Sequence, residues 1–311
     1  MIQDLESGRL ANEYKDKKIT SDDSVIVFAG REVLIGRDDD NNLSLPIFSD
    51  FRKYIEEGKL SKSDFQYVFE IAGCNYFLLL SYKIDIDAVN KEENVDITSE
   101  NKVQCGKNFN YEKVSSIRQL ISKDICFAVM TAYHLYIWYR DNQFCGRCGC
   151  RVKHDNVERM LKCEKCGNMI YPKIAPAVIV AVTDGDRILM TKYALTREYQ
   201  KYALIAGFTE IGETAEETVQ REVMEEVGIH VKNIKYYKSQ PWGIASNLLM
   251  GFFAELDGDK TIKLDEDELS CAEWFKREDM PAHDDGISLT REMMGVFEDK
   301  EKFDALSKKS S

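Results

Sequence analysis

The sequence contains 311 residues, 44% of them hydrophobic, which is enough for two ordinary globular domains. Its formal net charge of −12 argues against broad, non-specific binding of nucleic acids, although a local basic site remains compatible with it. The sequence predicts neither a membrane span nor a signal peptide, because it has no long apolar run and opens with the polar, acidic stretch MIQDLESGRL. Nine Cys, four of them in CxxC pairs, favour metal binding over disulfides, and we therefore expect a cytoplasmic protein.

The first region, residues 1–143, predicts an α+β domain. Its opening stretch is polar, and we expect it to be loosely ordered. Short strand-like runs follow, and residues 127–139 are apolar and aromatic enough for a buried helix. Arg118 could reach a phosphate, but an arginine on a helix surface is the commoner alternative.

The second region, residues 144–171, predicts a zinc ribbon. Its cysteines follow the pattern C-x2-C-x14-C-x2-C, with a glycine after the second cysteine of each pair. The four are Cys145, Cys148, Cys163 and Cys166. Four protein ligands close a tetrahedral site, so we expect the zinc to be structural. The alternative, two redox CxxC pairs, lacks a thioredoxin-like context.

The third region, residues 172–311, predicts a mixed α/β/α sandwich. Pro172 and Pro176 indicate an extended entry, and residues 177–183 and 188–191 predict a hairpin across the turn at 184–186. Further strands are expected after residue 230, and a helix near the C-terminus.

Residues 207–229 predict an acidic helix. Thr214 and Glu217 have the spacing of a capping box, and Gly228 suits the position after the helix end. Three glutamates spaced i, i+3 and i+4 fall on one helix face, at the border of an apolar stripe. They are Glu222, Glu225 and Glu226. Mg²⁺ and Mn²⁺ prefer such carboxylates, although a solvated acidic face is the commoner alternative for the spacing alone.

The whole segment resembles the Nudix box at every fixed position. The matching residues are Gly207, Glu213, Arg221-Glu222-Val223, Glu225-Glu226 and Gly228-Ile229. The resemblance implies a metal-dependent hydrolase of nucleoside diphosphates linked to another moiety. It also implies that Glu222 and Glu226 hold metal, that Glu225 is a ligand or general base, and that Arg221 pairs with Glu213.

The four-Cys ribbon, the segment YPKIAP, the box and the segment Ser239-Gln240-Pro241-Trp242 together resemble the NADH pyrophosphatase family of Nudix hydrolases. The resemblance implies hydrolysis of NAD(H) to nicotinamide mononucleotide and AMP, removal of NAD caps from RNA by some members, and a homodimer. It implies catalytic Mg²⁺ or Mn²⁺ at the Ala206 carbonyl, Glu222, Glu225, Glu226 and Glu268. The implied substrate contacts are Arg118, Glu158, Tyr171, Gln240, Pro241, Trp242, Gly243, Ile244, Ala245, Ser246, Asn247 and Thr290.

The chain departs from this family after Trp242, where Pro-Phe-Pro-x-Ser is usual. Gly243-Ile244-Ala245 stands there instead, and Ile244 can pack on a base but cannot stack, an interaction of about 1 kcal/mol. Gly243 is expected to loosen the loop relative to proline. Two alternatives stay open. One is a Nudix pyrophosphatase for another dinucleotide or a nucleotide sugar, such as ADP-ribose or a diadenosine polyphosphate, and the other is a non-catalytic module that binds nucleotide or RNA.

Overall fold

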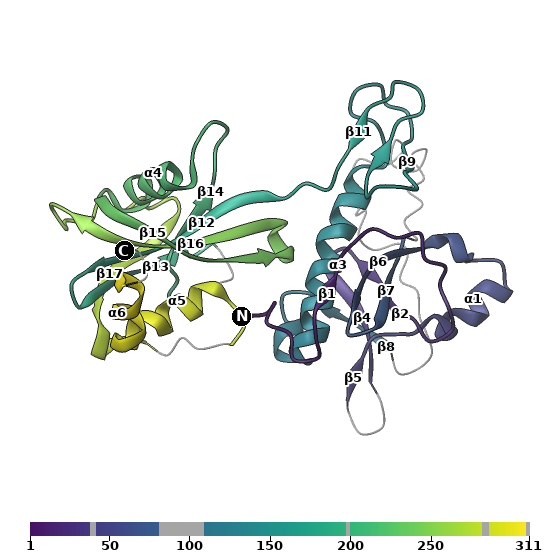
Figure 1. Ribbon diagram of the computed structural model, residues 1–311, viewed down its shortest axis with the longest axis horizontal. Coiled ribbons are helices and arrows are strands. Elements are labelled where there is room, and N and C mark those ends of the chain that lie inside the picture. The colour runs from purple at the N-terminus through teal and green to yellow at the C-terminus, as the bar shows by residue number, and fades with distance from the viewer. Residues whose placement is uncertain (38–41, 81–108, 197–199, 282–285, 309–311) are drawn as a thin grey trace. The chain divides into compact units, whose positions relative to one another are not determined.

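The computed structural model describes residues 1–37, 42–80, 109–196, 200–281 and 286–308 (Figure 1). The chain divides into two compact units. Unit 1 comprises residues 1–3, 174–242 and 247–311, and unit 2 comprises residues 4–173 and 243–246. The ribbon is counted within unit 2, and the three-part division at 1–143, 144–171 and 172–311 stays a prediction.

Unit 2 begins with an α+β fold, as predicted. One sheet has the strand order β1-β6-β7-β2, and a second has the order β3-β4-β5 with β8 pairing β4. The strands are β1 (Leu10–Ala11), β2 (Ser24–Ile26), β3 (Phe28–Ala29), β4 (Glu32–Arg37), β5 (Leu43–Ser44), β6 (Phe65–Ile71), β7 (Cys74–Leu79) and β8 (Phe109–Lys113). The helical segments are η1 (Phe48–Phe51), α1 (Arg52–Glu56), η2 (Lys62–Asp64), η3 (Ile117–Gln119) and α3 (Lys123–Asp141).

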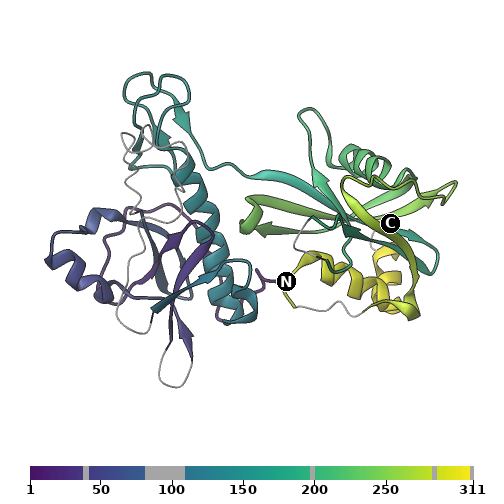
Figure 2. The ribbon, with the colours of Figure 1, turned by 180° about the vertical axis from the view of Figure 1, so that it is seen from behind.

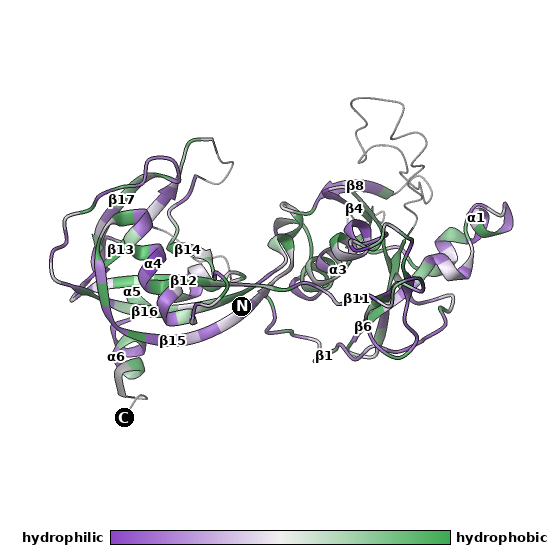
Figure 3. Cartoon of the chain, turned by 90° about the horizontal axis from the view of Figure 1, so that it is seen from above, coloured by the Kyte–Doolittle hydropathy of each residue, from purple (hydrophilic) through white to green (hydrophobic). Residues whose placement is uncertain are grey.

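Helix α3 confirms the predicted buried helix and extends it at both ends. Phe127, Val129 and Trp138 are all buried, and the rings of Tyr133 and Tyr136 pack on Phe28 at 5.2 and 5.0 Å. By contrast, α1 buries none of its residues, and Figure 3 shows a mixture of hydrophilic and hydrophobic colouring along it. Helix α3 is therefore buried on most of its sides.

The opening segment is ordered, so the expectation of a loose N-terminus is wrong. Leu10 pairs with Ile71 as β1 joins the edge of β6, and Ile19 is buried in the core. Lys17 forms an ion pair of 2.8 Å with Glu70. The polar composition of the segment did not predict this order. The segment is held by backbone hydrogen bonds and an ion pair to a strand some 60 residues away in the sequence.

The ribbon of unit 2 forms a small antiparallel sheet with the order β11-β10-β9. Its strands are β9 (Lys153–His154), β10 (Leu161–Lys162) and β11 (Met169–Ile170). His154 stacks on Tyr139 of α3 with ring centroids 4.9 Å apart, and His134 of α3 hydrogen-bonds the Lys173 carbonyl at 2.7 Å. The ribbon is therefore tied to the buried helix of its own unit.

Unit 1 contains a six-stranded sheet with the order β15-β16-β12-β13-β17, with β14 pairing β12. The strands are β12 (Ala175–Asp184), β13 (Arg187–Tyr193), β14 (Ile205–Phe208), β15 (His230–Trp242), β16 (Asn247–Asp257) and β17 (Leu269–Lys276). The helices are α4 (Ala215–Val227), η5 (Arg277–Asp279), α5 (Leu289–Glu298) and α6 (Lys300–Lys308). Helix α4 covers one face of the sheet and helices α5 and α6 the other, in both views (Figures 1 and 2).

Strand β12 explains why both faces need helices. Its even-numbered residues, such as Val178 and Val180, belong to the core cluster that includes Val223 of α4. Its odd-numbered residues, such as Ile179, belong to the cluster that includes Met293 of α5. Because side chains alternate across a strand, a strand that is apolar throughout must be covered on both sides. The predicted α/β/α sandwich is confirmed.

The short helix η4 (Gly243–Ala245), between β15 and β16, is counted with unit 2 and packs on α3. A Cβ atom on Gly243 would lie 1.9 Å from the Met130 carbonyl oxygen, well inside van der Waals contact. The glycine thus permits a close approach of the backbones of η4 and α3. It does not loosen the loop, contrary to what the sequence suggested.

Gly243→Ala should lower the free energy of unfolding by about 1–3 kcal/mol, because the added methyl forces η4 away from α3. Urea unfolding of both variants against the parent protein measures the effect. Gly146→Ala is the matched control: a Cβ there meets nothing within 4 Å, so the change should stay within about 0.5 kcal/mol. Equal stability of the two variants would contradict the close packing.

Candidate active site

Helix α4 presents the acidic residues, and its ends are built as predicted. Thr214 Oγ1 accepts from the Glu217 amide at 3.2 Å, and Glu217 Oε2 accepts from the Thr214 amide at 2.7 Å. Gly228 closes the helix in the left-handed conformation, with φ at 69°. The backbone groups at both helix ends find hydrogen-bond partners within the segment itself. The sequence therefore fixes where α4 begins and ends, and with it the positions of the glutamates along the helix.

The three glutamates have different environments. Glu222 and Glu226 are buried, with exposed fractions of 8% and 3%, beside the fully buried Val219 and Val223. Glu225 is exposed, with 58% of its side chain accessible. Two carboxylates therefore lie at the border of the core, where a bound cation would be shielded from solvent, and the third faces water.

Gly207 allows strand β14 to pass directly beside Glu222. A Cβ atom on Gly207 would lie 1.9 Å from Cδ of Glu222. Any larger residue would displace that carboxylate. Ala206, whose carbonyl is a predicted metal ligand, is the preceding residue of β14 and pairs with Ile179.

The Arg221 guanidinium is the centre of the site. Its Nε and Nη2 donate to the two carboxylate oxygens of Glu213, at 2.5 and 2.9 Å. Its Nη1 donates to Glu222 at 2.8 Å and to Glu225 at 2.9 Å, and its Nη2 also donates to the Phe208 carbonyl at 2.9 Å. The predicted pair of Arg221 and Glu213 is thus present as a bidentate contact.

The charges of this cluster shift its ionisation. Hydrogen bonding from Arg221 is the main reason that the pKa of Glu213 is lowered to about 2. Burial raises the pKa of Glu222, with the charges of Glu225 and Glu268 adding to this effect, while Arg221 opposes it. A carboxylate that is buried near two others would gain from a bound divalent cation.

Two contributors to the site were not predicted. The hydroxyl of Thr218 donates to Glu213 Oε2 at 3.0 Å, and the Phe208 carbonyl accepts from Arg221. The only sequence signal for Thr218 is its position four residues after the capping threonine. A backbone carbonyl such as that of Phe208 leaves no signal.

Several predicted site residues of unit 1 lie outside α4. Glu268 directly precedes β17 and acts electrostatically on Glu222. Gln240 is fully buried: its Nε2 donates to the Ile287 carbonyl at 2.8 Å, and its Oε1 accepts from the Leu289 amide at 2.7 Å. This side chain therefore positions the start of α5, the helix that contains the half-buried Thr290.

The end of β15 and the start of β16 hold three more predicted substrate contacts, Pro241, Trp242 and Asn247. Asn247 is 6% exposed, and its Oδ1 has no hydrogen-bond partner among the residues described. A buried acceptor without a donor lowers the stability of the fold. Unpaired buried groups of this kind call for an explanation, and a bound ligand is one.

The remaining predicted contacts belong to unit 2. Tyr171 donates its hydroxyl to Glu158 Oε2 at 2.8 Å, so the structure brings these two together. Arg118 lies half-buried in η3, close enough to Cys126 for its charge to act on that thiol. The other four residues, Gly243, Ile244, Ala245 and Ser246, form η4 and the turn after it.

The four ribbon cysteines are gathered as a metal site requires. Their Sγ atoms all lie within 4.8 Å of one another, with 3.6 Å between Cys145 and Cys166 and 3.5 Å between Cys148 and Cys163. Four sulfurs about 2.3 Å from a zinc ion would be about 3.8 Å apart, so the cluster fits Zn²⁺. The backbone amide of Cys166 is the main cause of the lowered pKa of the Cys163 thiol, whereas the pKa of the neighbouring Cys148 thiol is raised.

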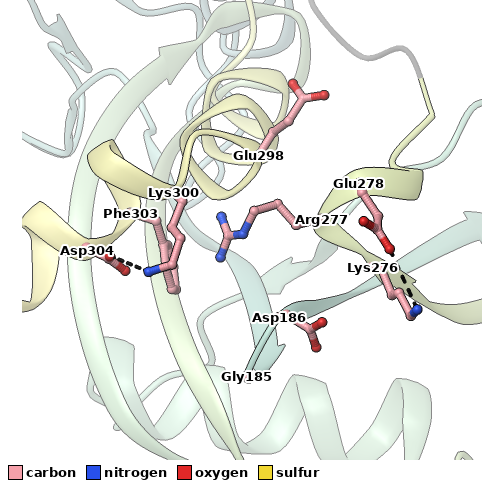
Figure 4. A pocket seen from close by; sticks show the side chains of 9 residues that line it. All are labelled: Gly185, Asp186, Lys276, Arg277, Glu278, Glu298, Lys300, Phe303 and Asp304. Carbon is pink, nitrogen blue, oxygen red and sulfur yellow. Dashed lines mark hydrogen bonds and ion pairs between the residues drawn. The ribbon is translucent and has the colours of Figure 1, made fainter.

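A separate open cavity of about 710 Å³ lies in unit 1 (Figure 4). Two of its lysines are already paired: Lys276 with Glu278 and Lys300 with Asp304. Arg277 packs on Phe297, with its guanidinium carbon 4.1 Å from the ring centroid. None of the predicted site residues lines this cavity, and its carboxylates outnumber its cations, which makes it a poor site for a diphosphate.

Comparison with known proteins agrees with this geometry. Residues 173–294 match the NUDIX domain family. The chain is 39% identical over 170 residues to the NAD-capped RNA hydrolase NudC of Pectobacterium carotovorum, and 38% identical over 170 residues to that of Citrobacter koseri. Each match covers 54% of this chain and 65% of the relative, so it spans slightly less than two thirds of the relatives' length. Among solved structures, a NUDIX hydrolase from Nitrosomonas europaea matches 51% of this chain and 92% of its own, with 22% identity and a TM-score of 0.45.

The part of the chain that contains the acidic helix is thus similar to the NUDIX domain family. The predicted resemblance of the chain to the NADH pyrophosphatase family of Nudix hydrolases is confirmed by the curated relatives. Within the described parts of the chain, no helix combines the length and apolar character needed to cross a membrane.

Cys163→Ser should abolish zinc binding and destabilise the ribbon, because one of four ligands is lost. Zinc measured by mass spectrometry of the purified protein should fall from about one ion per chain to almost none. Cys150→Ser is the matched control, since Cys150 adjoins the cluster but is not part of it. Full zinc content in the Cys163 variant would refute the four-cysteine site.

Proposed function

We propose that the chain hydrolyses the diphosphate of NAD(H) to nicotinamide mononucleotide and AMP with Mg²⁺ or Mn²⁺, and that it removes NAD caps from RNA. The main support is the 39% identity over 170 residues with a protein named NAD-capped RNA hydrolase. That match extends beyond the 122 residues of the NUDIX domain, so it includes sequence outside the general catalytic fold. The acidic helix supplies the chemistry that such a reaction needs.

The proposed metal ligands are Glu222, Glu225, Glu226, Glu268 and the Ala206 carbonyl. These ligands offer hard oxygen atoms. Because Glu222 and Glu226 are buried, few water molecules would compete with their carboxylates for the metal ion. When bound, Mg²⁺ or Mn²⁺ would neutralise charge on the phosphate oxygens and make a water molecule more acidic. The ribbon cysteines would hold a structural Zn²⁺.

The residues of the chain have separate tasks in this scheme. Arg221 and Glu213 orient the carboxylates through the five hydrogen bonds that Arg221 donates. Glu225, the most exposed of the three helix glutamates, would be either a metal ligand or the base that accepts a proton from the attacking water. The water oxygen bonds to one phosphorus, the bridging P–O bond breaks, and the departing phosphate takes the electron pair.

The proposed substrate contacts are those implied by the resemblance. They are Arg118, Glu158, Tyr171, residues 240–247 and Thr290. The orphaned Asn247 Oδ1 and the exposed pair of Glu158 and Tyr171 support a role for polar groups in this set. We also propose a homodimer located in the cytoplasm.

A second candidate function is hydrolysis of another dinucleotide or a nucleotide sugar. One observation favours it: Gly243 is fitted against α3, and the half-buried Ile244 follows in place of a stacking ring. The helix η4 is thus shaped around residues that differ from the family pattern. The base that it accepts could differ accordingly.

Product analysis tests these functions directly. Purified protein is incubated with NADH, ADP-ribose or a diadenosine polyphosphate, with and without Mn²⁺. Release of AMP and reduced nicotinamide mononucleotide, dependent on metal, supports the first proposal. Cleavage of another compound only supports the second, and no cleavage of any supports a binding module instead.

Glu226→Gln should lower turnover by a factor of at least about 10³, because it removes a buried metal-binding charge with little change of shape. Circular dichroism checks that the fold is retained. Glu216→Gln, an exposed change in the first turn of the same helix, is the matched control and should leave turnover nearly unchanged. A near-normal rate in the Glu226 variant would remove that residue from the site.

A further inference from the structure

The tip of the ribbon hairpin, residues 155–159, is a closed turn. Asp155 Oδ1 accepts from the amides of Val157 and Glu158 at 2.8 and 3.0 Å. The Asp155 amide donates to the Met160 carbonyl at 3.0 Å. The turn is therefore rigid in itself, and what remains to be fixed is its orientation relative to the rest of unit 2.

Arg159 supplies that orientation. Its Nη2 donates to the Val68 carbonyl of β6 at 2.5 Å and to the Asn12 carbonyl at 3.2 Å. No ion pair of Arg159 with a carboxylate occurs among the residues described, and burial lowers its pKa. Arg159 is half-buried, and its donation to two backbone carbonyls indicates a specific fixing role rather than a free surface charge.

A second contact acts on the same turn. The Tyr14 hydroxyl donates to the Asp155 carbonyl at 2.8 Å. Tyr14 and Asn12 come from the opening segment, which β1 fastens to the edge of β6. The hairpin tip is therefore fixed at both of its ends to one sheet.

Glu158 lies between these two anchors. It adjoins Arg159 in the chain and accepts the hydrogen bond of Tyr171. Both side chains are exposed, so their mutual geometry depends on the backbone that carries them. If Arg159 lost its bonds to the Val68 and Asn12 carbonyls, the backbone at Glu158 would be free to rotate. The hydrogen bond between Tyr171 and Glu158 would then have no fixed geometry.

We infer that Arg159 is a positioning residue, which holds the Glu158 and Tyr171 pair in the orientation that binds the dinucleotide. The inference rests on the proposed function for the role of that pair, and it adds a residue that would not itself touch the substrate. It also gives the ordered N-terminal segment a function, since Asn12 and Tyr14 complete the anchor.

The test compares Arg159→Met, which keeps most of the side-chain volume and removes the donors, with Arg151→Met. Arg151 is an exposed arginine of the same ribbon, whose guanidinium lies over the Phe144 ring at 5.1 Å. The KM for NADH should rise about tenfold in the Arg159 variant, the size of one lost charge-assisted contact, with kcat within about twofold. Zinc content should stay at the level of the parent protein. An unchanged KM would overturn the inference.

A lysine variant covers the case in which Arg159→Met does not fold. The amine of Arg159→Lys keeps the charge and can reach one carbonyl, so KM should rise by only about threefold. That partial rescue distinguishes positioning from general loss of structure. A KM equal to that of the parent protein in the lysine variant would overturn the inference.

A spectroscopic measurement needs no turnover at all. In protein labelled with ¹³C at tyrosine Cζ, the Tyr171 resonance reports its hydrogen bond to Glu158 and is assigned with Tyr171→Phe. The resonance should shift in Arg159→Met and stay in place in Arg151→Met. Failure of the parent protein to cleave NADH would count against the proposed function, whereas an unmoved Tyr171 resonance would count against the positioning role.

Discussion

The bidentate contact between Arg221 and Glu213 is the interaction on which the acidic face of α4 depends. Glu222, Glu225 and Glu226 lie on one side of a single helix, and carboxylates so arranged repel one another. Arg221 bonds two of them as well as Glu213, so one positive charge offsets part of this repulsion. The same guanidinium reaches the Phe208 carbonyl at the end of β14. It therefore joins the helix, the loop before it and the neighbouring strand into one rigid group.

That group can exist only because the core positions its parts. Val219 and Val223 are fully buried against the even-numbered residues of β12, which fixes the rotation of α4 about its axis. The rotation then decides which glutamates are buried and which is exposed. Strand β14 must pass close to Glu222, and the absence of a side chain at Gly207 makes this possible. The packing of the apolar residues of α4 therefore also determines where its acidic residues lie.

Features set by residues close together in the chain could be predicted. The capping box of Thr214 and Glu217, the end of α4 at Gly228 and the two cysteine knuckles all depend on short spacings. Features set by distant partners could not. The opening segment is ordered by β6, and the Gln240 amide holds the start of α5. Arg159 had no signal either, since its two acceptors are backbone carbonyls far away in sequence.

The conformation of η4 illustrates this limit most clearly. Judged from sequence, Gly243 differs from the usual proline by its flexibility. In the structure the difference lies in the missing Cβ atom, since any Cβ there would meet the Met130 carbonyl of α3. Proline has a Cβ as well, so the usual Pro-Phe-Pro segment could not take this path beside α3. The consequence extends to Ile244, whose placement follows from the path of the backbone before it. The path of this loop is then set by α3 and η4 jointly, and exchanging the loop residues alone for Pro-Phe-Pro would break the contact with the Met130 carbonyl.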